Sequence, residues 1–516
     1  MNTLLKSLLL TLFCFAAAAA NAASDKPNII YILADDLGYG DVHCLNPERG
    51  KIATPQMDQL AAEGMVFSDA HSSSSVCTPT RYGILTGRYN WRTRLQRSVL
   101  FGYSPPLINK ERVTVADFLK DQGYNTSCIG KWHLGMNMPT TDGKPANKAG
   151  NNVDWTGVIA DNPVHHGFDY FYGISASLDM PPYIFIENDR FVGECTVKKN
   201  PYKNREGHAH VDFEVVDVLP EIQRKSVQYI QQQKADQPFF MYIALNSPHT
   251  PIVPSSQWQG KSGLGDYGDF VMQTDDVIGQ ITAAVDAAGF KDNTIIVVTS
   301  DNGCSANPSN AEVLEQKGHY PSAHFRGYKS DLWDGGHRVP FIVRWPAGVK
   351  AGSVCDQTIC LTDLMATCAD VLGTTLPPTA GEDSVSFLPA LKGDAIVSAR
   401  KGVVHHSIAG KFAYRDGKWK LLLTNGSGGW TKEKTSDDAE AQLYDMQADP
   451  SEQTNLYRSH PEVAQRLLAQ LESDVRRGRS TDGPELSNDV RVNLKQPRLT
   501  TANKSNSATK SRRRKD

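Results

Sequence analysis

The sequence predicts an α/β fold, with a large, mostly parallel sheet sandwiched by helices. Three apolar runs carry this prediction, at residues 28–34, 239–245 and 294–299. None of them alternates between apolar and polar residues, as expected of strands buried on both faces of a parallel sheet. Segments with helical periodicity lie between the runs, and this alternation of strand and helix is typical of doubly wound sheets.

The helices are predicted from their start and stop signals. Thr54-Pro55 opens one helix and Gly64 closes it, because proline suits a first turn and glycine a helix end. Further helices are expected at residues 114–119, 221–234 and 267–288, and a further strand at 126–129. Residues 137–152 have the composition of a surface insertion, and residues 179–218 show no long periodic pattern.

The pattern changes after residue 400. Residues 411–422 alternate around Asp416-Gly417, which predicts a β-hairpin, and residues 462–471 have helical periodicity. We therefore expect a main domain at residues 23–400 and a small antiparallel sheet plus helix at 401–478. Residues 479–516 are polar and basic, which predicts a disordered tail.

The N-terminus has the features of a secretory signal peptide over residues 1–22. Lys6 precedes an apolar run that ends at Ala20-Asn21-Ala22, a small-x-small cleavage signal. The run is shorter than the roughly 20 residues that a bilayer helix needs. No later segment is apolar enough to span a membrane. The sequence thus predicts a periplasmic or secreted protein without a membrane span.

Charge and cysteine content narrow the function further. The net charge is −3, and residues 497–516 carry seven Lys/Arg against one Asp, so the rest of the chain is clearly acidic and a nucleic-acid-binding body is not indicated. Of nine cysteines, Cys14 leaves with the signal peptide. Disulfides are permitted in this compartment, but their pairing cannot be read from the sequence. No Cys/His spacing indicates zinc.

Polar residues follow the predicted strands repeatedly. They are Asp35-Asp36, Lys131 with His133, His249, and Asp301-Asn302. In doubly wound sheets, sites collect beyond the carboxyl ends of the strands. The three carboxylates and the amide oxygen suit a hard cation, Ca²⁺ or Mg²⁺. Each aspartate taken singly could instead cap the helix that follows it.

A cysteine lies in the stretch Cys77-Thr78-Pro79-Thr80-Arg81, after a run of serines. Pro79 suits the first turn of a helix, which places Cys77 at a helix N-terminus, where negative charge is stabilised. Taken alone, Cys77 is better explained as a small buried side chain. Arg81, with the basic residues Lys131, His133, His249 and Lys329, would add positive charge and proton donors, although a lone histidine is more often structural.

In this order and context, the motifs resemble those of type I, formylglycine-dependent sulfatases in the alkaline-phosphatase superfamily, close to the arylsulfatase A and N-acetylgalactosamine-6-sulfatase branch. The matching segments are residues 28–38, 77–81 with 85–88, 130–135, 300–303, 335–340, and 443–445 with 449–450. One departure is Asp334, where the family usually has glutamate. We expect that residue to shape its loop.

The resemblance implies a secreted enzyme that hydrolyses sulfate esters of a sugar or an aryl alcohol. It implies that a maturation enzyme converts Cys77 to formylglycine, whose hydrate attacks sulfur. The implied ligands of one Ca²⁺ ion are Asp35, Asp36, modified Cys77, Asp301 and Asn302. Arg81 would hold the diol, Lys131 and Lys329 would bind sulfate, His133 would orient the hydroxyl, and His249 would protonate the leaving oxygen.

Two alternatives remain open at this point. One is a phosphodiesterase or phosphonate hydrolase on the same fold, and the other is a non-catalytic binder of sulfated glycans that keeps Cys77 as a thiol. Residues 179–218 are the expected pocket for a sulfated sugar. Candidate contacts are His208, His210, Asp189, Arg190 and Lys203, with Arg92 and Arg94, and each of them could equally be an ordinary polar residue.

Overall fold

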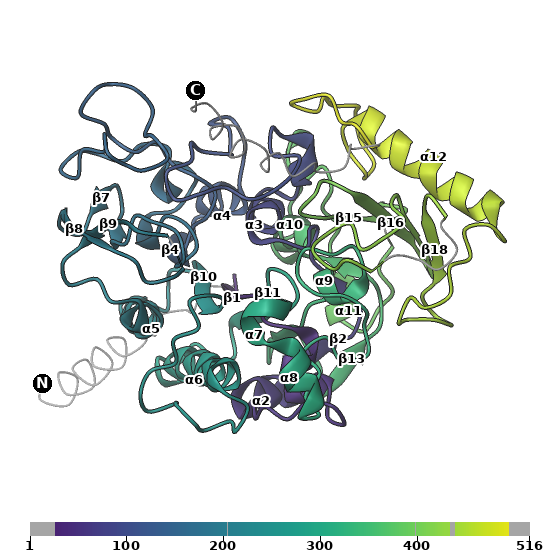
Figure 1. Cartoon of the computed structure of the whole chain (residues 1–516), viewed down its shortest axis with the longest axis horizontal. Coiled ribbons are helices and arrows are strands. Elements are labelled where there is room, and N and C mark those ends of the chain that lie inside the picture. The colour runs from purple at the N-terminus through teal and green to yellow at the C-terminus, as the bar shows by residue number, and fades with distance from the viewer. Residues whose placement is uncertain (1–25, 204, 398, 434–438, 495–516) are drawn as a thin grey trace, which may run out of the picture.

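The computed structural model describes residues 26–494 except 204, 398 and 434–438. Its centre is a ten-stranded sheet in the order β13-β2-β12-β11-β1-β10-β4-β5-β6-β7 (Figure 1). The strands are β1 Asn28–Asp35, β2 Met65–Phe67, β4 Asn125–Lys131, β5 Tyr170–Ile174, β6 Ile186–Glu187, β7 Arg190–Phe191, β10 Phe239–Pro248, β11 Thr294–Ser300, β12 Phe341–Arg344 and β13 Ser353–Cys355. The long central strands β11, β1, β10, β4 and β5 are parallel, which confirms the predicted sheet.

Helices cover both faces of this sheet. They are α2 Pro55–Glu63, α3 Cys77–Thr86, α4 Val115–Asp121, α5 Val218–Gln231, α6 Asp266–Ala287 and α10 Leu364–Val371. Alternate side chains of β1 pack against the helices on opposite faces of the sheet. Ile30 and Ile32 pack in the core with α2, α5 and α6. Tyr31 and Leu33 pack with α3, α4 and α10. Burial on both faces explains why β1 carries no polar alternation.

A second, smaller sheet lies beside the first, on the side away from β6 and β7 (Figure 1). It contains the antiparallel strands β15 Val403–His406, β16 Phe412–Asp416, β17 Trp419–Leu422 and β18 Gln442–Asp445. Helix α12, Pro461–Arg477, buries Leu467 and Leu471 against this sheet. The predicted hairpin around Asp416-Gly417 is formed by β16 and β17.

Several segments differ from expectation or fall outside the described residues. Residues 195–210 contain the two-stranded sheet of β8 Cys195–Lys199 and β9 Gly207–His210. Residues 479–494, expected as part of a disordered tail, lie against the body. Asp489 pairs with Arg88, and Asn488 accepts a hydrogen bond from Arg92. The signal-peptide prediction and the rest of the tail concern residues outside the description.

Two findings bear on the cysteines and on membranes. The eight cysteines from Cys44 onward all carry free thiols in the described part of the chain. No helix between residues 26 and 494, as far as described, combines the length and apolar character needed to cross a bilayer.

Candidate active site

The carboxyl ends of the central strands bring the predicted residues to one edge of the sheet. Strand β1 ends at Asp35, which pairs in register with Pro248 of β10. On its other side, Ala34 pairs with Ser300 of β11, directly before Asp301. Strand β4 ends at Lys131. Sequence-distant residues therefore meet because parallel strands share an edge.

Three buried carboxylates form the centre of the site. Asp36 accepts a hydrogen bond of 2.7 Å from Asn302 Nδ2, and its backbone N–H donates to Asp301 at 3.3 Å. Lys131 Nζ lies 2.6 Å from Asp35 and Lys329 Nζ lies 2.6 Å from Asp36. Arg81 NH2 lies 2.8 Å from Asp301. Each carboxylate thus has a cationic neighbour.

Cys77 is the first residue of α3 and is 2% exposed. One ligand-type atom each from Cys77, Asp35 and Asp301 lies within 4.8 Å of the others, and the same holds for Asp35, Asp36 and His249. The backbone N–H groups at the start of α3 favour an anion at Cys77.

Left-handed backbone conformations mark this edge. Asp36 has φ 66°, His133 φ 58° and Ser330, which follows Lys329, φ 86°. Non-glycine residues adopt such values at a cost, and they persist where the surrounding structure fixes them. These three turns direct Asp36, His133 and Lys329 to the site instead of continuing regular structure.

The pKa values reflect burial and the close charges. Burial alone would raise the pKa of Asp35, but Lys131, His249 and Arg81 hold it well below its usual range. Burial and the charge of Asp35 raise the pKa of Asp301 to about 6. Burial raises the pKa of the Cys77 thiol, although Lys131 and Lys329 oppose the rise. An unmodified Cys77 would therefore remain a protonated thiol, which is a weak nucleophile.

The unpartnered atoms of the site test whether these residues fit a cation. Asp35 Oδ1 and Asn302 Oδ1 are buried and have no hydrogen-bond partner. Buried oxygens of this kind are costly unless a ligand satisfies them. Together with Asp36 and Asp301 they form an all-oxygen donor set, which fits Ca²⁺ or Mg²⁺.

The two histidines are held in different ways. His133 Nε2 lies 2.8 Å from the carbonyl oxygen of Leu100, so Nε2 carries the proton and the buried, unpartnered Nδ1 is an acceptor. Burial, Lys131 and Arg81 keep the pKa of His133 well below its ordinary value, so the ring is neutral. His249 Nδ1 donates to the Thr250 carbonyl at 2.7 Å, while Nε2 lies 3.7 Å from Asp36.

The sequence analysis missed polar residues that the fold brings to the same edge. Ser175 and Ser177 follow β5, and Asn246 lies near the end of β10. Their side chains are at most 3% exposed, and Ser175 Oγ, Ser177 Oγ and both amide atoms of Asn246 lack hydrogen-bond partners. The signal available in the sequence was the position of Asn246 directly after the apolar run 239–245. Ser175 lies beside His133, because His133 N donates to the Ser175 carbonyl.

Several of the suggested sugar contacts have structural partners. Arg92 is fully buried and forms a two-pronged pair with Asp383, which corrects its assignment as a sugar contact. His208 Nε2 lies 3.0 Å from Asn151 Oδ1, so it joins the β8–β9 region to the 137–152 insertion. Arg94 donates to the carbonyls of Pro105 and Pro106.

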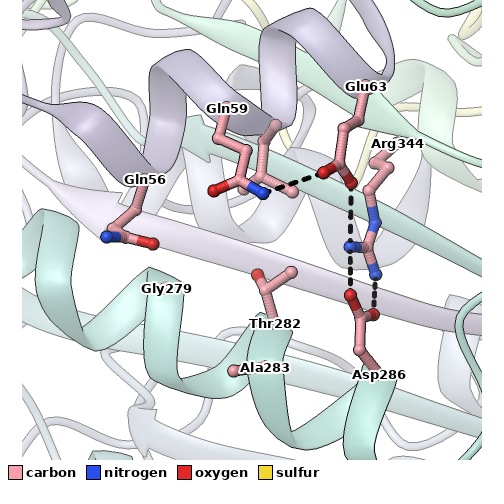
Figure 2. A pocket seen from close by; sticks show the side chains of 9 residues that line it. Gln56, Gln59, Glu63, Gly279, Thr282, Ala283, Asp286 and Arg344 are labelled. Atoms are coloured by element: carbon pink, nitrogen blue, oxygen red, sulfur yellow. Dashed lines mark hydrogen bonds and ion pairs between the residues drawn. The ribbon is translucent and has the colours of Figure 1, made fainter.

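A small cavity of about 100 Å³ lies elsewhere, between α2 and α6 (Figure 2). Arg344 closes one end of it by pairing with Asp286 at 2.6 Å and Glu63 at 3.4 Å (Figure 2). The guanidinium of Arg344 is thus already paired with carboxylates, and none of the predicted site residues lines this cavity. We therefore place the candidate site at the carboxyl edge of the sheet.

A mostly parallel sheet with carboxylates, cations and a helix N-terminus at its carboxyl edge suits a hydrolase of anionic esters. The sequence model of the sulfatase family matches residues 27–374, and a model described as N-sulphoglucosamine sulphohydrolase, C-terminal, matches residues 328–480. The chain belongs to the sulfatase family and is a sulfuric ester hydrolase.

Individual proteins similar to this chain are sulfatases as well. An N-acetylgalactosamine-6-O-sulfatase of Bacteroides thetaiotaomicron is 36% identical over 493 residues, covering 87% of this chain and 93% of the relative. Human arylsulfatase A is 31% identical, with coverage of 90% and 92%. A solved structure from work on glycosaminoglycan metabolism by Bacteroides thetaiotaomicron has a TM-score of 0.77 at 34% identity, covering 87% of this chain and 99% of the other. The phosphonate monoester hydrolase of Agrobacterium radiobacter shares the fold, with a TM-score of 0.56 at 17% identity and coverage of 87% and 95%.

Proposed function

We propose that this chain removes sulfate from sulfated carbohydrates, after conversion of Cys77 to formylglycine and binding of one Ca²⁺ ion. The observation that carries the proposal is the position of Cys77. It starts α3 within reach of Asp35 and Asp301, and Lys131 pairs with Asp35 while Lys329 pairs with the adjacent Asp36. This arrangement suits a reaction in which negative charge develops on sulfate oxygens.

Burial raises the pKa of the Cys77 thiol, so an unmodified Cys77 would contribute little as a nucleophile. When present, a hydrated formylglycine supplies a geminal diol as the attacking group. Its Cβ would keep the place of Cys77 Cβ at the start of α3. The conversion itself requires a maturation enzyme as a partner of the chain.

Asp35, Asp36, Asp301 and Asn302 would hold the Ca²⁺ ion together with the modified residue 77. The two unpartnered oxygens, Asp35 Oδ1 and Asn302 Oδ1, support this assignment. When bound, the cation supplies positive charge that polarises an anionic substrate oxygen. Arg81 is fixed between Asp301 and the Lys131 carbonyl, so its guanidinium remains at the floor of the site.

The chain's other residues divide the work of binding and proton transfer. Lys131 and Lys329 offer ammonium groups to the sulfate. His133 Nδ1, a neutral acceptor, would orient a hydroxyl on residue 77. His249 has its Nδ1 proton committed to the Thr250 carbonyl, so Nε2 faces the site and would protonate the leaving oxygen. Ser177 Oγ and Asn246 remain free to meet substrate oxygens.

The name of the Bacteroides thetaiotaomicron relative suggests N-acetylgalactosamine 6-sulfate as the first sugar to test. A periplasmic or secreted location, as the N-terminal residues predict, would suit a polysaccharide substrate. A phosphodiesterase or phosphonate hydrolase remains the second candidate function, because sulfate and phosphate esters have similar shape and charge and the Agrobacterium radiobacter enzyme has this fold.

The proposal is tested on protein expressed in a host with the maturation machinery. Mass analysis of the peptide that contains Cys77 should show loss of sulfur, and the protein should release sulfate from N-acetylgalactosamine 6-sulfate and from a generic aryl sulfate. An unmodified thiol would favour a non-catalytic glycan binder. Faster turnover of the matching aryl phosphate diester than of the sulfate would favour the second candidate.

A further inference from the structure

A pocket of about 510 Å³ lies beside the candidate active site and has no role in the chemistry described above. It is lined by Phe101–Pro105, Ala146, Lys148, Met180, Pro181 and Arg205. Leu100 joins it to the site: the Leu100 carbonyl accepts from His133 Nε2 at 2.8 Å, and its N–H donates to Thr78 Oγ1 at 3.2 Å. One wall of the pocket therefore begins at Phe101, directly after Leu100, whose backbone is hydrogen-bonded to His133 and to Thr78, the residue after Cys77.

An exposed aromatic ring forms the apolar wall. Phe101 is 56% exposed, an unusual state for phenylalanine, while Tyr103 and Met180 beneath the pocket are buried. Sugar rings have apolar C–H faces that stack on aromatic side chains and remove such surface from water. An exposed ring beside a site that handles sulfated sugars therefore offers a platform for a second sugar unit.

The loop that carries Phe101 is fixed in place. The Phe101 N–H donates to Ser104 Oγ at 2.9 Å, and Met136 N donates to the Ser104 carbonyl. A Cβ on Gly102 would lie 1.9 Å from the Pro181 carbonyl oxygen, so the loop touches the far wall directly. Arg94 braces the end of the loop through Pro105 and Pro106. Such pre-organisation lowers the entropy cost of binding.

Positive charge lines the opposite side. Lys148 has no acidic partner within ion-pair distance among the residues that the structure describes. Arg205 NH1 lies 3.0 Å from Asp179 Oδ2 and keeps a 38% exposed side chain, while Asp179 is 5% exposed and its Oδ1 has no hydrogen-bond partner. Asp179 holds Arg205 in position and offsets its charge, so Lys148 and the half-exposed Arg205 together leave one net positive charge beside Phe101.

We infer that this pocket binds the sugar next to the sulfated residue, and that this neighbour carries an anionic group. Its apolar face would stack on Phe101 and its carboxylate or second sulfate would meet Lys148 and Arg205. The inference rests on the proposed function. It assigns substrate selection to the 137–152 insertion and the 179–218 segment, which contribute Lys148 and Arg205.

The first experiment compares three synthetic substrates: N-acetylgalactosamine 6-sulfate alone, the same sugar joined to a hexuronic acid, and the same sugar joined to a neutral hexose. We expect the acidic disaccharide to have a kcat/KM at least about tenfold above that of the monosaccharide, with the neutral one between them. A third disaccharide with a sulfated neutral neighbour distinguishes a preference for carboxylate from one for sulfate. Equal values for all substrates would overturn the inference.

Variants then assign the preference to the pocket. Phe101→Ala should lower kcat/KM for all three disaccharides by about tenfold and leave the monosaccharide unchanged. Lys148→Gln should lower it severalfold for acidic disaccharides alone, since an exposed ion pair contributes modestly. Arg205→Gln should act in the same direction. Lys198→Gln, which removes an exposed cation of β8 outside the pocket, is the matched control and should change nothing.

A binding measurement separates this inference from the proposed function. The acidic disaccharide is titrated into the inactive Cys77→Ala variant by calorimetry, with and without Phe101→Ala. Weaker binding on loss of the ring supports the pocket even where no turnover of these sugars occurs. An affinity unchanged by Phe101→Ala, or no binding at all, would overturn the pocket assignment while leaving turnover of an aryl sulfate intact.

Discussion

Two of the buried clusters of charged residues in the described part of the chain differ in how completely their polar atoms are satisfied. The first is the candidate site, with Asp35, Asp36 and Asp301. The second, here the closed cluster, joins the large sheet to the small one and comprises Asp69, His71, Asp334, His337, Arg338, His405, Arg415, Lys420 and Glu452. Both contain histidines, carboxylates and cations away from solvent.

In the closed cluster the carboxylates are saturated. Lys420 Nζ lies 2.7 Å from Asp334 and 2.8 Å from Glu452. Asp69 meets His71 at 2.8 Å, Arg415 at 2.9 Å and Arg338 at 3.0 Å. These pairs link the small sheet, through Arg415 and Lys420, to the body. Asp334 shapes this junction, consistent with the expectation that it has a structural role.

The three histidines of the closed cluster invite comparison with a metal site, but their geometry excludes a shared ion. His337 and His405 stack face to face, with ring centroids 3.7 Å apart and planes 9° apart. Ring-nitrogen lone pairs lie in the ring plane, so two parallel stacked rings cannot both direct a lone pair at one cation. Cationic Lys420 also lies 3.1 Å from His337 Nε2.

The candidate site leaves several polar atoms open, among them Asp35 Oδ1, Asn302 Oδ1 and His133 Nδ1, whereas His405 Nε2 is the one buried side-chain atom of the closed cluster's named residues without a hydrogen-bond partner. A structural cluster satisfies its own groups, because unsatisfied buried groups cost stability. A binding site leaves groups for its ligands to satisfy. The comparison therefore separates two clusters that the residue types alone would not distinguish.

The largest expected effect concerns the open site. Cys77→Ala should lower sulfate-ester hydrolysis on the order of 10⁵-fold, because it removes the precursor of the nucleophile. The melting temperature should stay within a few degrees, since the change trims one small side chain. Sulfate release and thermal melting measure the two. Cys44→Ser, at a partly exposed cysteine, is the control, and substantial residual activity in Cys77→Ala would contradict the assignment.

The next effect contrasts one lysine from each cluster. Lys420→Met should lower the free energy of unfolding by about 3–5 kcal/mol, because Asp334 and Glu452 lose their buried cation. In the calcium-loaded protein, Lys131→Met should instead reduce activity and leave stability nearly unchanged. Denaturant unfolding and steady-state kinetics distinguish them, and equal losses of stability would break the proposed distinction.

Removal of calcium should have an intermediate effect. A chelator should abolish activity and lower stability by about 2.7 kcal/mol relative to protein with calcium at a hundredfold excess over its Kd. The physical reason is repulsion among Asp35, Asp36 and Asp301 once the cation leaves. Thermal melting with and without added calcium measures this effect. Full activity after chelation, or melting independent of calcium, would contradict the metal assignment.

The smallest effect concerns Asp474 of α12, a buried carboxyl outside both clusters whose Oδ2 has no hydrogen-bond partner. Burial, with the charge of Asp383, raises its pKa to about 7. The folded state then binds the proton more tightly than the unfolded state, so the stability contribution is present below about pH 4 and is lost as pH rises to about 7. We expect a loss of about 2 kcal/mol between pH 5 and pH 7.

Asp474→Asn should flatten this pH dependence and leave activity unchanged. Glu472→Gln, at an exposed position of the same helix, is the control and should leave the slope as it is. Unfolding free energies measured from pH 5 to pH 8 test the prediction. A slope unchanged by Asp474→Asn would show that this carboxyl is stabilised in its charged form.

Local sequence determined the elements and the chemical groups of this protein. The apolar run of β1 predicts a doubly buried strand, and Pro79 predicts the helix that starts at Cys77. The acidic pair after β1 and the Asp301-Asn302 pair after β11 predict an oxygen-rich site. The strand and the helix are confirmed, because periodicity and turn residues act over a few neighbouring positions, while the oxygen-rich site stays a prediction.

Only the tertiary structure decided which polar residues are open and which are saturated. Arg92 and Arg94 look alike in sequence, yet Arg92 is buried against Asp383 and Arg94 braces the loop of Phe101. Lys131 and Lys420 are both buried lysines, but only Lys131 lies at the carboxyl edge of the parallel strands. Such differences depend on partners more than a hundred residues away in several cases, and no local pattern specifies a long-range contact.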